Sequence, residues 1–77
     1  MKKHKYRIIT KNGRYKVYID NMLFLSFNQI DYLGHYAFKD DEFLYRIDIY
    51  LKGENVIETS YKTKEVWTQI LKILDTI

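Results

Sequence analysis

Hydrophobic and polar positions alternate through most of the chain, and this alternation predicts β-strands as far as residue 61. Residues 5–10 and 14–19 flank Asn12-Gly13, a strong hairpin signal because both turn residues adopt positive φ in a type I′ turn. Pairing across that turn makes one face of the hairpin suitable for a core. The opposite face then carries Lys5, Arg7, Ile9, Lys11, Arg14, Lys16 and Tyr18.

A third strand is predicted at residues 22–27, after a second tight turn at Asp20-Asn21. This strand is apolar on both faces. It is therefore either central in a sheet and covered on two sides, or it leaves part of one face for a partner. Strict alternation places Leu23, Leu25 and Phe27 opposite Met22 and Phe24.

Residues 28–38 combine a strand-like pattern with a glycine that interrupts it, Gly34. We predict a bent or bulged strand here, with a short helix as the alternative. In the strand interpretation one alternating face carries Ile30, Tyr32, Tyr36 and Phe38.

The clearest strand spans residues 43–51, after a charged turn at residues 39–42. A turn at residues 52–54 leads from it into a strand at residues 55–61. A three-residue loop places Ile49 opposite Ile57, whereas a two-residue loop would place it opposite Glu58 and turn a carboxylate toward the core. We therefore predict the three-residue register.

From Lys64 the period becomes helical, which predicts a helix over residues 64–76 lying on the sheet. Thr63 is the expected N-cap, and Glu65 suits the positive end of the helix dipole. We expect Trp67 to anchor the helix. Its apolar stripe consists of Val66, Trp67, Ile70, Leu71, Ile73, Leu74 and Ile77.

These elements predict an α+β fold, an antiparallel meander of about five or six short strands, curved or partly closed, with one C-terminal amphipathic helix packed on it. We expect a single domain over residues 1–77 with a mobile segment at residues 1–4. The chain has no cysteine, so its stability must come from packing among the 47% of residues that are hydrophobic.

Charge divides the chain unevenly. Seven basic residues and no acidic one precede Asp20, whereas six basic and ten acidic residues follow from there, giving +7 and −4 and a formal net charge of +3. The basic hairpin face is a candidate surface for an acidic protein or for nucleic-acid phosphates, through Lys5, Arg7, Lys11, Arg14, Lys16 and Tyr18. The alternative is a solvated strand whose lysines prevent edge-to-edge aggregation.

Catalytic, metal and cofactor sites are not predicted. The histidines His4 and His35 stand apart from any nucleophile arrangement, and the glycines are isolated instead of forming a phosphate-binding loop. The acidic run at residues 40–42 lacks the spacing of a calcium loop and is interpreted as a solvated turn. We therefore expect a protein that is not an enzyme.

A non-enzymatic binding module is the expected function, with a protein partner preferred over nucleic acid. The small size suggests an accessory protein, for instance of a phage or mobile element, that acts on a larger partner. A homodimer through the C-terminal helix is left open. No apolar run approaches the length of a membrane helix and the start is not a signal peptide, so we expect a cytoplasmic protein without membrane contact.

Overall fold

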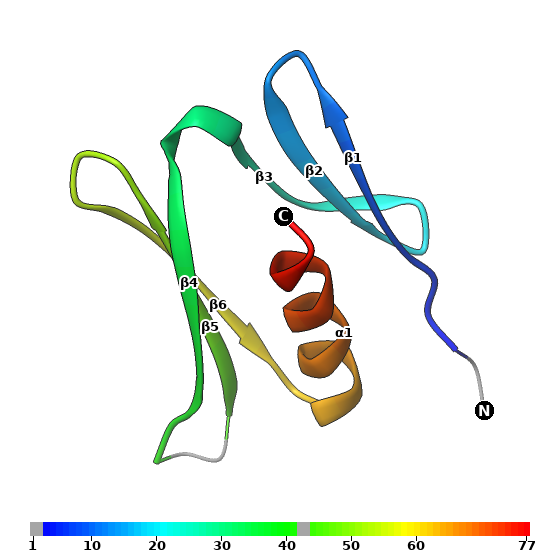
Figure 1. Cartoon of the computed structure of the whole chain (residues 1–77). Coiled ribbons are helices and arrows are strands. Elements are labelled where there is room, and N and C mark those ends of the chain that lie inside the picture. Colours follow the sequence, from blue (N-terminus) through cyan, green and yellow to red (C-terminus); the bar gives the residue numbers. More distant parts are fainter. Residues whose placement is uncertain (1–2, 42–43) are drawn as a thin grey trace. The chain divides into compact units, whose positions relative to one another are not determined.

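The structure, a computed structural model, describes residues 3–41 and 44–77. In these residues the chain forms two three-stranded antiparallel sheets and one α-helix (Figure 1). Sheet A consists of β1 (Tyr6–Lys11), β2 (Arg14–Ile19) and β3 (Met22–Asn28). A short 3-10 helix (Gln29–Asp31) follows, and then come β4 (Tyr32–Lys39), β5 (Tyr45–Leu51) and β6 (Asn55–Tyr61) of sheet B, and α1 (Lys64–Asp75).

The α+β class and the six antiparallel strands are confirmed, but the single curved or partly closed meander is wrong, because the strands form two separate open sheets. The break lies at the 3-10 helix, where Asn28 Nδ2 donates to Asp31 Oδ2 at 3.2 Å. The amide of Gln29 donates to the carbonyl of Gly13 at 2.8 Å. These bonds end β3 and turn the chain, so that neither β3 nor β4 pairs with the other in the described part of the chain.

The chain divides into two compact units, which are residues 1–31 with sheet A and residues 32–77 with sheet B and α1. The prediction of a single domain is not tested by this division and stays a prediction. Of the predicted mobile segment, residues 1–2 lie outside the described residues. The predicted turn and strand start at residues 42–43 lie outside them as well.

In the first unit the predicted hairpin register is confirmed, with Lys11 opposite Arg14. Asn12 and Gly13 have φ of 53° and 74°, as a type I′ turn requires. The second predicted turn is also present, because Ile19 pairs with Met22 across two residues of positive φ.

Strand β3 is an edge strand of sheet A and not a central one. A bulge shifts its register, so that Leu25 lies opposite Val17 while Leu23 lies opposite Tyr18. The extra residue between them, Phe24, puts Leu23 and Leu25 on opposite faces of the sheet. The expectation that Leu23 shares a face with Leu25 and Phe27 is therefore wrong. Leu25 and Phe27 are buried.

Sheet B confirms the three-residue loop, because Ile49 pairs with Ile57 and Leu51 with Asn55. Ile47 and Ile49 of β5 are 0% exposed. Their neighbours across β4 are Ala37 and His35.

The predicted shared face of residues 30, 32, 36 and 38 is wrong, although Tyr36 and Phe38 do share one face. A register shift between Tyr32 and Gly34 moves Tyr32 to the opposite face, where it contacts His35. Ile30 belongs to the 3-10 helix, which was the alternative interpretation of this stretch.

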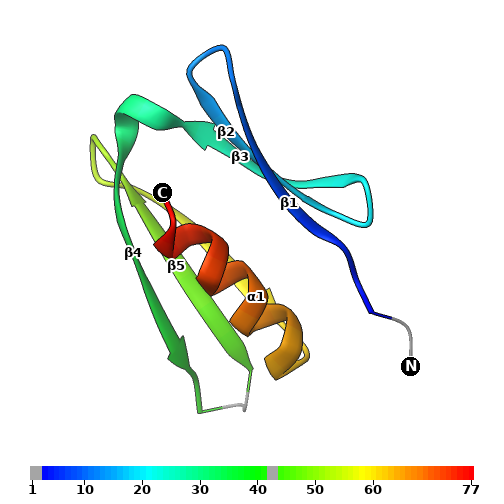
Figure 2. The same cartoon turned by 45° about the vertical axis from the view of Figure 1, so that its right-hand side comes forward.

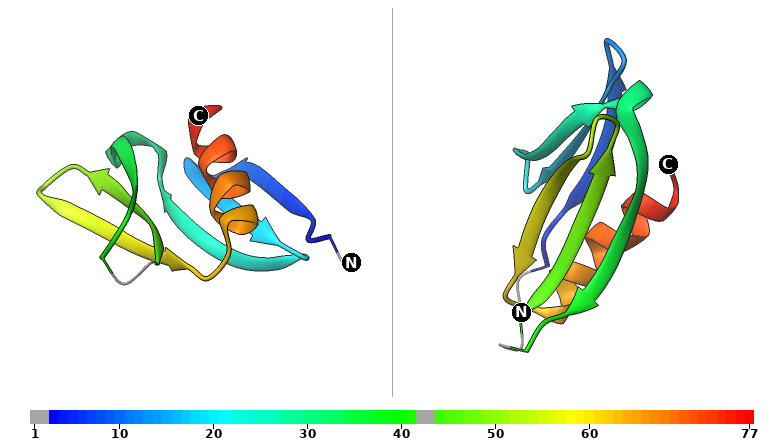
Figure 3. Two further views of the ribbon diagram at one scale, coloured as in Figure 1. Left: turned by 90° about the horizontal axis from the view of Figure 1, so that it is seen from below. Right: turned by 90° about the vertical axis from the view of Figure 1, so that its left-hand side faces the viewer.

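Helix α1 begins after Thr63, whose Oγ1 accepts a hydrogen bond from the amide of Val66 at 3.4 Å, so the predicted N-cap is confirmed. The helix ends at Asp75, one residue before the expected end. Its buried residues are Ile70 and Leu74. It packs against β5 and β6, on one face of sheet B (Figures 2 and 3).

Tyr61, the last residue of β6, should make the protein less stable in alkali. It is 4% exposed, and burial raises the pKa of its hydroxyl above the usual 10.0, partly offset by a hydrogen bond with Thr59. The unfolded chain therefore loses this proton before the folded one does. The free energy of unfolding should fall as pH rises above about 10, the ordinary tyrosine pKa, whereas this group has no effect near neutrality.

Urea unfolding between pH 8 and pH 11 measures this effect, with Tyr61→Phe as the control because it removes the titrating group. The parent should lose more stability than the variant over that range. Identical pH profiles would contradict the assignment.

Candidate binding surface

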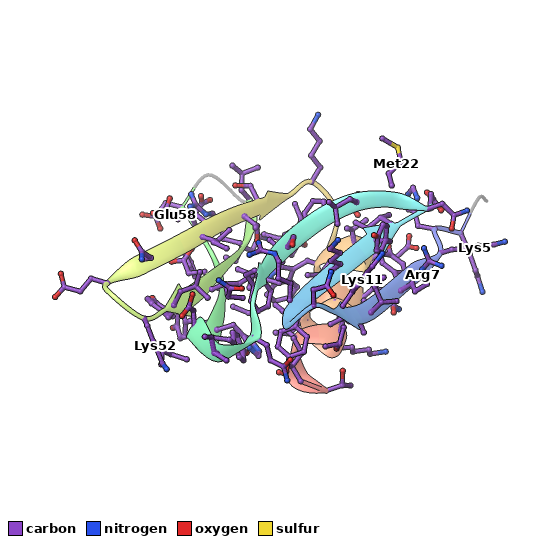
Figure 4. The ribbon with its side chains drawn as sticks, turned by 90° about the horizontal axis from the view of Figure 1, so that it is seen from above. Lys5, Arg7, Lys11, Met22, Lys52 and Glu58 are labelled. Carbon is purple, nitrogen blue, oxygen red and sulfur yellow. The ribbon has the colours of Figure 1, made fainter. Side chains whose placement is uncertain are left out.

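The β1–β2 hairpin places all six candidate residues on one face of sheet A. Arg7 lies opposite Tyr18, and Lys11 lies opposite Arg14. Lys5 precedes β1 and continues the alternation, held by a hydrogen bond from the amide of Asp20 to its carbonyl at 2.8 Å. Figure 4 shows Lys5, Arg7 and Lys11 along this hairpin. We call this surface the basic face: Lys5, Arg7, Lys11, Arg14, Lys16 and Tyr18.

The basic face has no neutralising partner within residues 3–41 and 44–77, because none of its five cationic side chains forms an ion pair there. The two acids of the first unit, Asp20 and Asp31, lie at turns. Asp20 contacts His4 Nδ1 at 2.6 Å and accepts from the amide of Lys5 at 2.8 Å. Asp31 accepts from Asn28. No ion pair among the described residues therefore neutralises the positive charge of the basic face.

Two arginines of the basic face are held in fixed positions. The Arg7 guanidinium carbon lies 4.8 Å from the centroid of the Tyr18 ring, a cation–π contact. Arg14 Nε donates to Ser26 Oγ of β3 at 3.1 Å. Such contacts lower the entropy that these long side chains lose on binding a partner.

One end of sheet A adds exposed apolar residues that the sequence interpretation did not include in the site. Met22, Leu23 and Phe24 are 74%, 55% and 41% exposed, and we call them the apolar corner. Together with His4, Ile19 and Asp20 they line an open pocket of about 320 Å³. Figure 4 shows Met22 projecting at this end.

The bulge at Phe24 brings one residue of the apolar corner, Leu23, to the side of the basic face, whereas Met22 pairs with Ile19 on the other side of sheet A. The bulge places Leu23 opposite Tyr18, and therefore on the same side of sheet A as Arg7. The sequence signal was a strand that is apolar on both faces, a pattern that also fits a partner covering one of them.

A second polar cluster lies in the second unit and centres on His35. Its Nε2 lies 2.7 Å from Asp75 Oδ1 and its Nδ1 lies 2.5 Å from the Tyr32 hydroxyl. Because a carboxylate oxygen only accepts, Nε2 is assigned as the donor to Asp75 Oδ1. The chain of bonds fastens the last residue of α1 to β4. We interpret it as structural, and the expectation that the protein is not an enzyme stays a prediction.

Two residues of the predicted solvated turn at residues 40–42, Asp40 and Asp41, belong to the described part of the chain. Asp40 Oδ1 accepts from the amide of Leu44 at 3.0 Å, and its Oδ2 lies 3.8 Å from an Arg46 nitrogen. Among described residues no cluster of three or more histidine, cysteine or acidic side chains is suited to hold a metal ion.

Helix α1, of 12 residues, is too short to cross a membrane, and no other described helix could do so. The expected cytoplasmic location and the homodimer through the helix stay predictions. Comparison of the chain with known protein families, with curated protein sequences and with solved structures gives no match.

Proposed function

We propose that this protein is a non-enzymatic binding module that attaches to an acidic, partly apolar surface of a larger protein. The observation that supports this function best is that exposed Leu23 of the apolar corner lies on the side of the basic face, beside Tyr18, which in turn pairs with Arg7. Nucleic-acid phosphates match the cations alone. A protein surface matches both the cations and the exposed apolar side chains.

The two parts of the surface have different physical roles. The five cations attract an acidic partner over a distance of about 10 Å at ordinary ionic strength and orient it on arrival. Leu23 then loses its exposed area to the partner, and burial of apolar area in an interface supplies most of the affinity. Binding should therefore weaken with salt but persist at physiological ionic strength.

The test uses a fluorescent peptide in which Glu alternates with Leu and Phe, and a second peptide with Ser in place of the apolar residues. Replacing Arg7, Arg14 and Lys16 together by Ala should weaken binding of the first peptide at least about tenfold. Leu23→Ser should weaken it as well, and should remove the preference for the apolar peptide.

The matched control replaces Lys62, Lys64 and Lys72 by Ala, because these exposed lysines of the second unit carry the same charge. It should leave the affinity within about twofold, since screening limits the effect of distant exposed charges. If the control weakens binding as much as the basic-face variant does, the peptide is attracted by the net charge of the protein and not by the basic face. The proposed surface would then be wrong.

A nucleic-acid-binding protein is the second candidate, favoured by the row of cations along two paired strands with Tyr18 among them. A labelled oligonucleotide titrated at two salt concentrations separates the candidates. For nucleic acid, affinity should fall steeply with salt, and each lost phosphate contact should lower the salt slope by about one. Dissociation weaker than about 10⁻⁴ M at physiological salt would exclude this candidate.

A further inference from the structure

The second unit carries a separate exposed surface, the face of sheet B that is turned away from the buried Ile47 and Ile49. Strand registers arrange it as three rows across β4, β5 and β6. We call it the outer face, and its rows are Phe38, Arg46, Ser60; then Tyr36, Asp48, Glu58; then Gly34, Tyr50, Val56.

Apolar and aromatic side chains on the outer face are open to solvent. Tyr36 is 60% exposed, Tyr50 41% and Val56 43%. The Tyr36 ring also stacks on Phe38, with the ring centroids 5.6 Å apart. Exposed tyrosines close together are typical of interfaces, because each buries a large area while losing few rotatable bonds.

Asp48 lies at the centre of the outer face and is not neutralised there. It forms no hydrogen bond or ion pair with any described residue, and its Oδ1 is buried. Glu58, a like charge, lies directly opposite it. The adjacent Arg46 contacts Glu58 Oε2 at 3.2 Å and Asp40 Oδ2 at 3.8 Å, but not Asp48. A half-buried carboxylate without a hydrogen-bond donor costs free energy. Contact of Asp48 with a cation from another molecule would therefore be favourable.

The chain itself supplies a surface of complementary charge. Residues 1–31 contain seven bases and two acids, net +5, whereas residues 32–77 contain six bases and eight acids, net −2. An arginine is the cation that best fits carboxylates between tyrosines, because its guanidinium binds carboxylate oxygens and stacks on aromatic rings. Arg7 of the basic face is exposed and already stacks on Tyr18.

We propose that the outer face of sheet B binds the basic face of a second copy of this chain, with the Arg7 guanidinium against Asp48 and Glu58 between Tyr36 and Tyr50. Two such contacts related by a two-fold axis give a closed dimer, and a contact that does not close gives longer assemblies. Self-association covers the basic face and therefore competes with the acidic partner proposed above.

Sedimentation equilibrium of the full chain from micromolar to millimolar concentration tests the proposal at low and high salt. Arg7→Glu and Asp48→Arg should each weaken self-association at least about tenfold. An equimolar mixture of these two variants should associate again, because the reversed charges complement each other. Asp48→Asn, which preserves the shape of the side chain, should weaken association as well.

Matched controls reverse exposed charges at the β5–β6 turn, Lys52→Glu and Glu54→Arg, and should leave the association constant within about twofold. A chain that is monomeric at all these concentrations in low salt would overturn the proposal. So would association that both reversals leave unchanged, or a mixture that does not associate although circular dichroism shows both variants folded. A dimer sensitive to residues of α1 instead would indicate the helix-mediated contact.

Discussion

Replacing Ile49 by Asp should unfold sheet B and α1, at a cost of at least about 4 kcal/mol. Ile49 is 0% exposed and lies between His35 on β4 and Ile57 on β6, so its side chain belongs to the centre of this unit. The substitution removes apolar contacts and leaves an unpaired carboxylate where water cannot reach it. A unit of this size is stabilised by only a few kcal/mol, so this loss exceeds what it can tolerate.

Amide exchange over residues 45–61, followed with circular dichroism, measures the effect. Tyr50→Asp is the matched control, because the next residue of the same strand faces the opposite side and is 41% exposed. It should cost no more than about 1 kcal/mol, the span of strand propensities. Equal loss of protection in both variants would show that the two faces of sheet B are not distinguished as the register requires.

Local turn chemistry explains why much of the fold could be predicted from the sequence. Asn12-Gly13 fixes the pairing of β1 and β2, because a two-residue turn with positive φ permits one register. In the β5–β6 hairpin, a three-residue loop is predicted because it keeps Glu58 out of the core, and Ile49 does pair with Ile57. A cap residue and a change of period were likewise sufficient to locate α1.

Bulges and the 3-10 helix could not be predicted, because alternation alone does not reveal an extra residue. One extra residue in a strand moves every side chain beyond it to the other face of the sheet. Leu23 and Tyr32 therefore lie on the faces opposite to those expected. The alternation of Ile30 and Tyr32 continues through the 3-10 helix although the backbone is no longer extended. The separation into two sheets follows from this short segment.

The candidate site shows the same division. Predicting the basic face required only the position of one turn and the alternation of side chains along a strand. All six of its residues therefore lie on the face that the sequence predicted. The apolar corner depends on the bulge at Phe24. The unneutralised carboxylate of Asp48 depends on which acids Arg46 contacts, and the pairing of His35 with Asp75 joins residues 40 positions apart. Contacts of that kind are set by tertiary packing and leave no local pattern.

Truncating Trp67 to Ala should cost about 3 kcal/mol and detach α1 from sheet B. The indole packs against the Tyr45 ring, with the centroids 5.3 Å apart, and its Nε1 donates to the carbonyl of Arg46 at 2.9 Å. Both contacts join the first half of the helix to β5. The substitution therefore removes a large apolar contact and also leaves a backbone carbonyl in need of a donor.

Trp67→Phe separates these two contributions, because it keeps a ring beside Tyr45 and removes only the donor and part of the area. We expect it to cost about 1–2 kcal/mol, the value of a lost hydrogen bond with its acceptor left unpaired. Urea unfolding followed by circular dichroism measures both variants, since Trp67 is the single tryptophan and its fluorescence is lost. Lys72→Ala, on the exposed side of α1, should stay within about 0.5 kcal/mol of the parent. If Trp67→Ala were no more harmful than Lys72→Ala, packing of α1 on sheet B would have to rest on Ile70 and Leu74 alone.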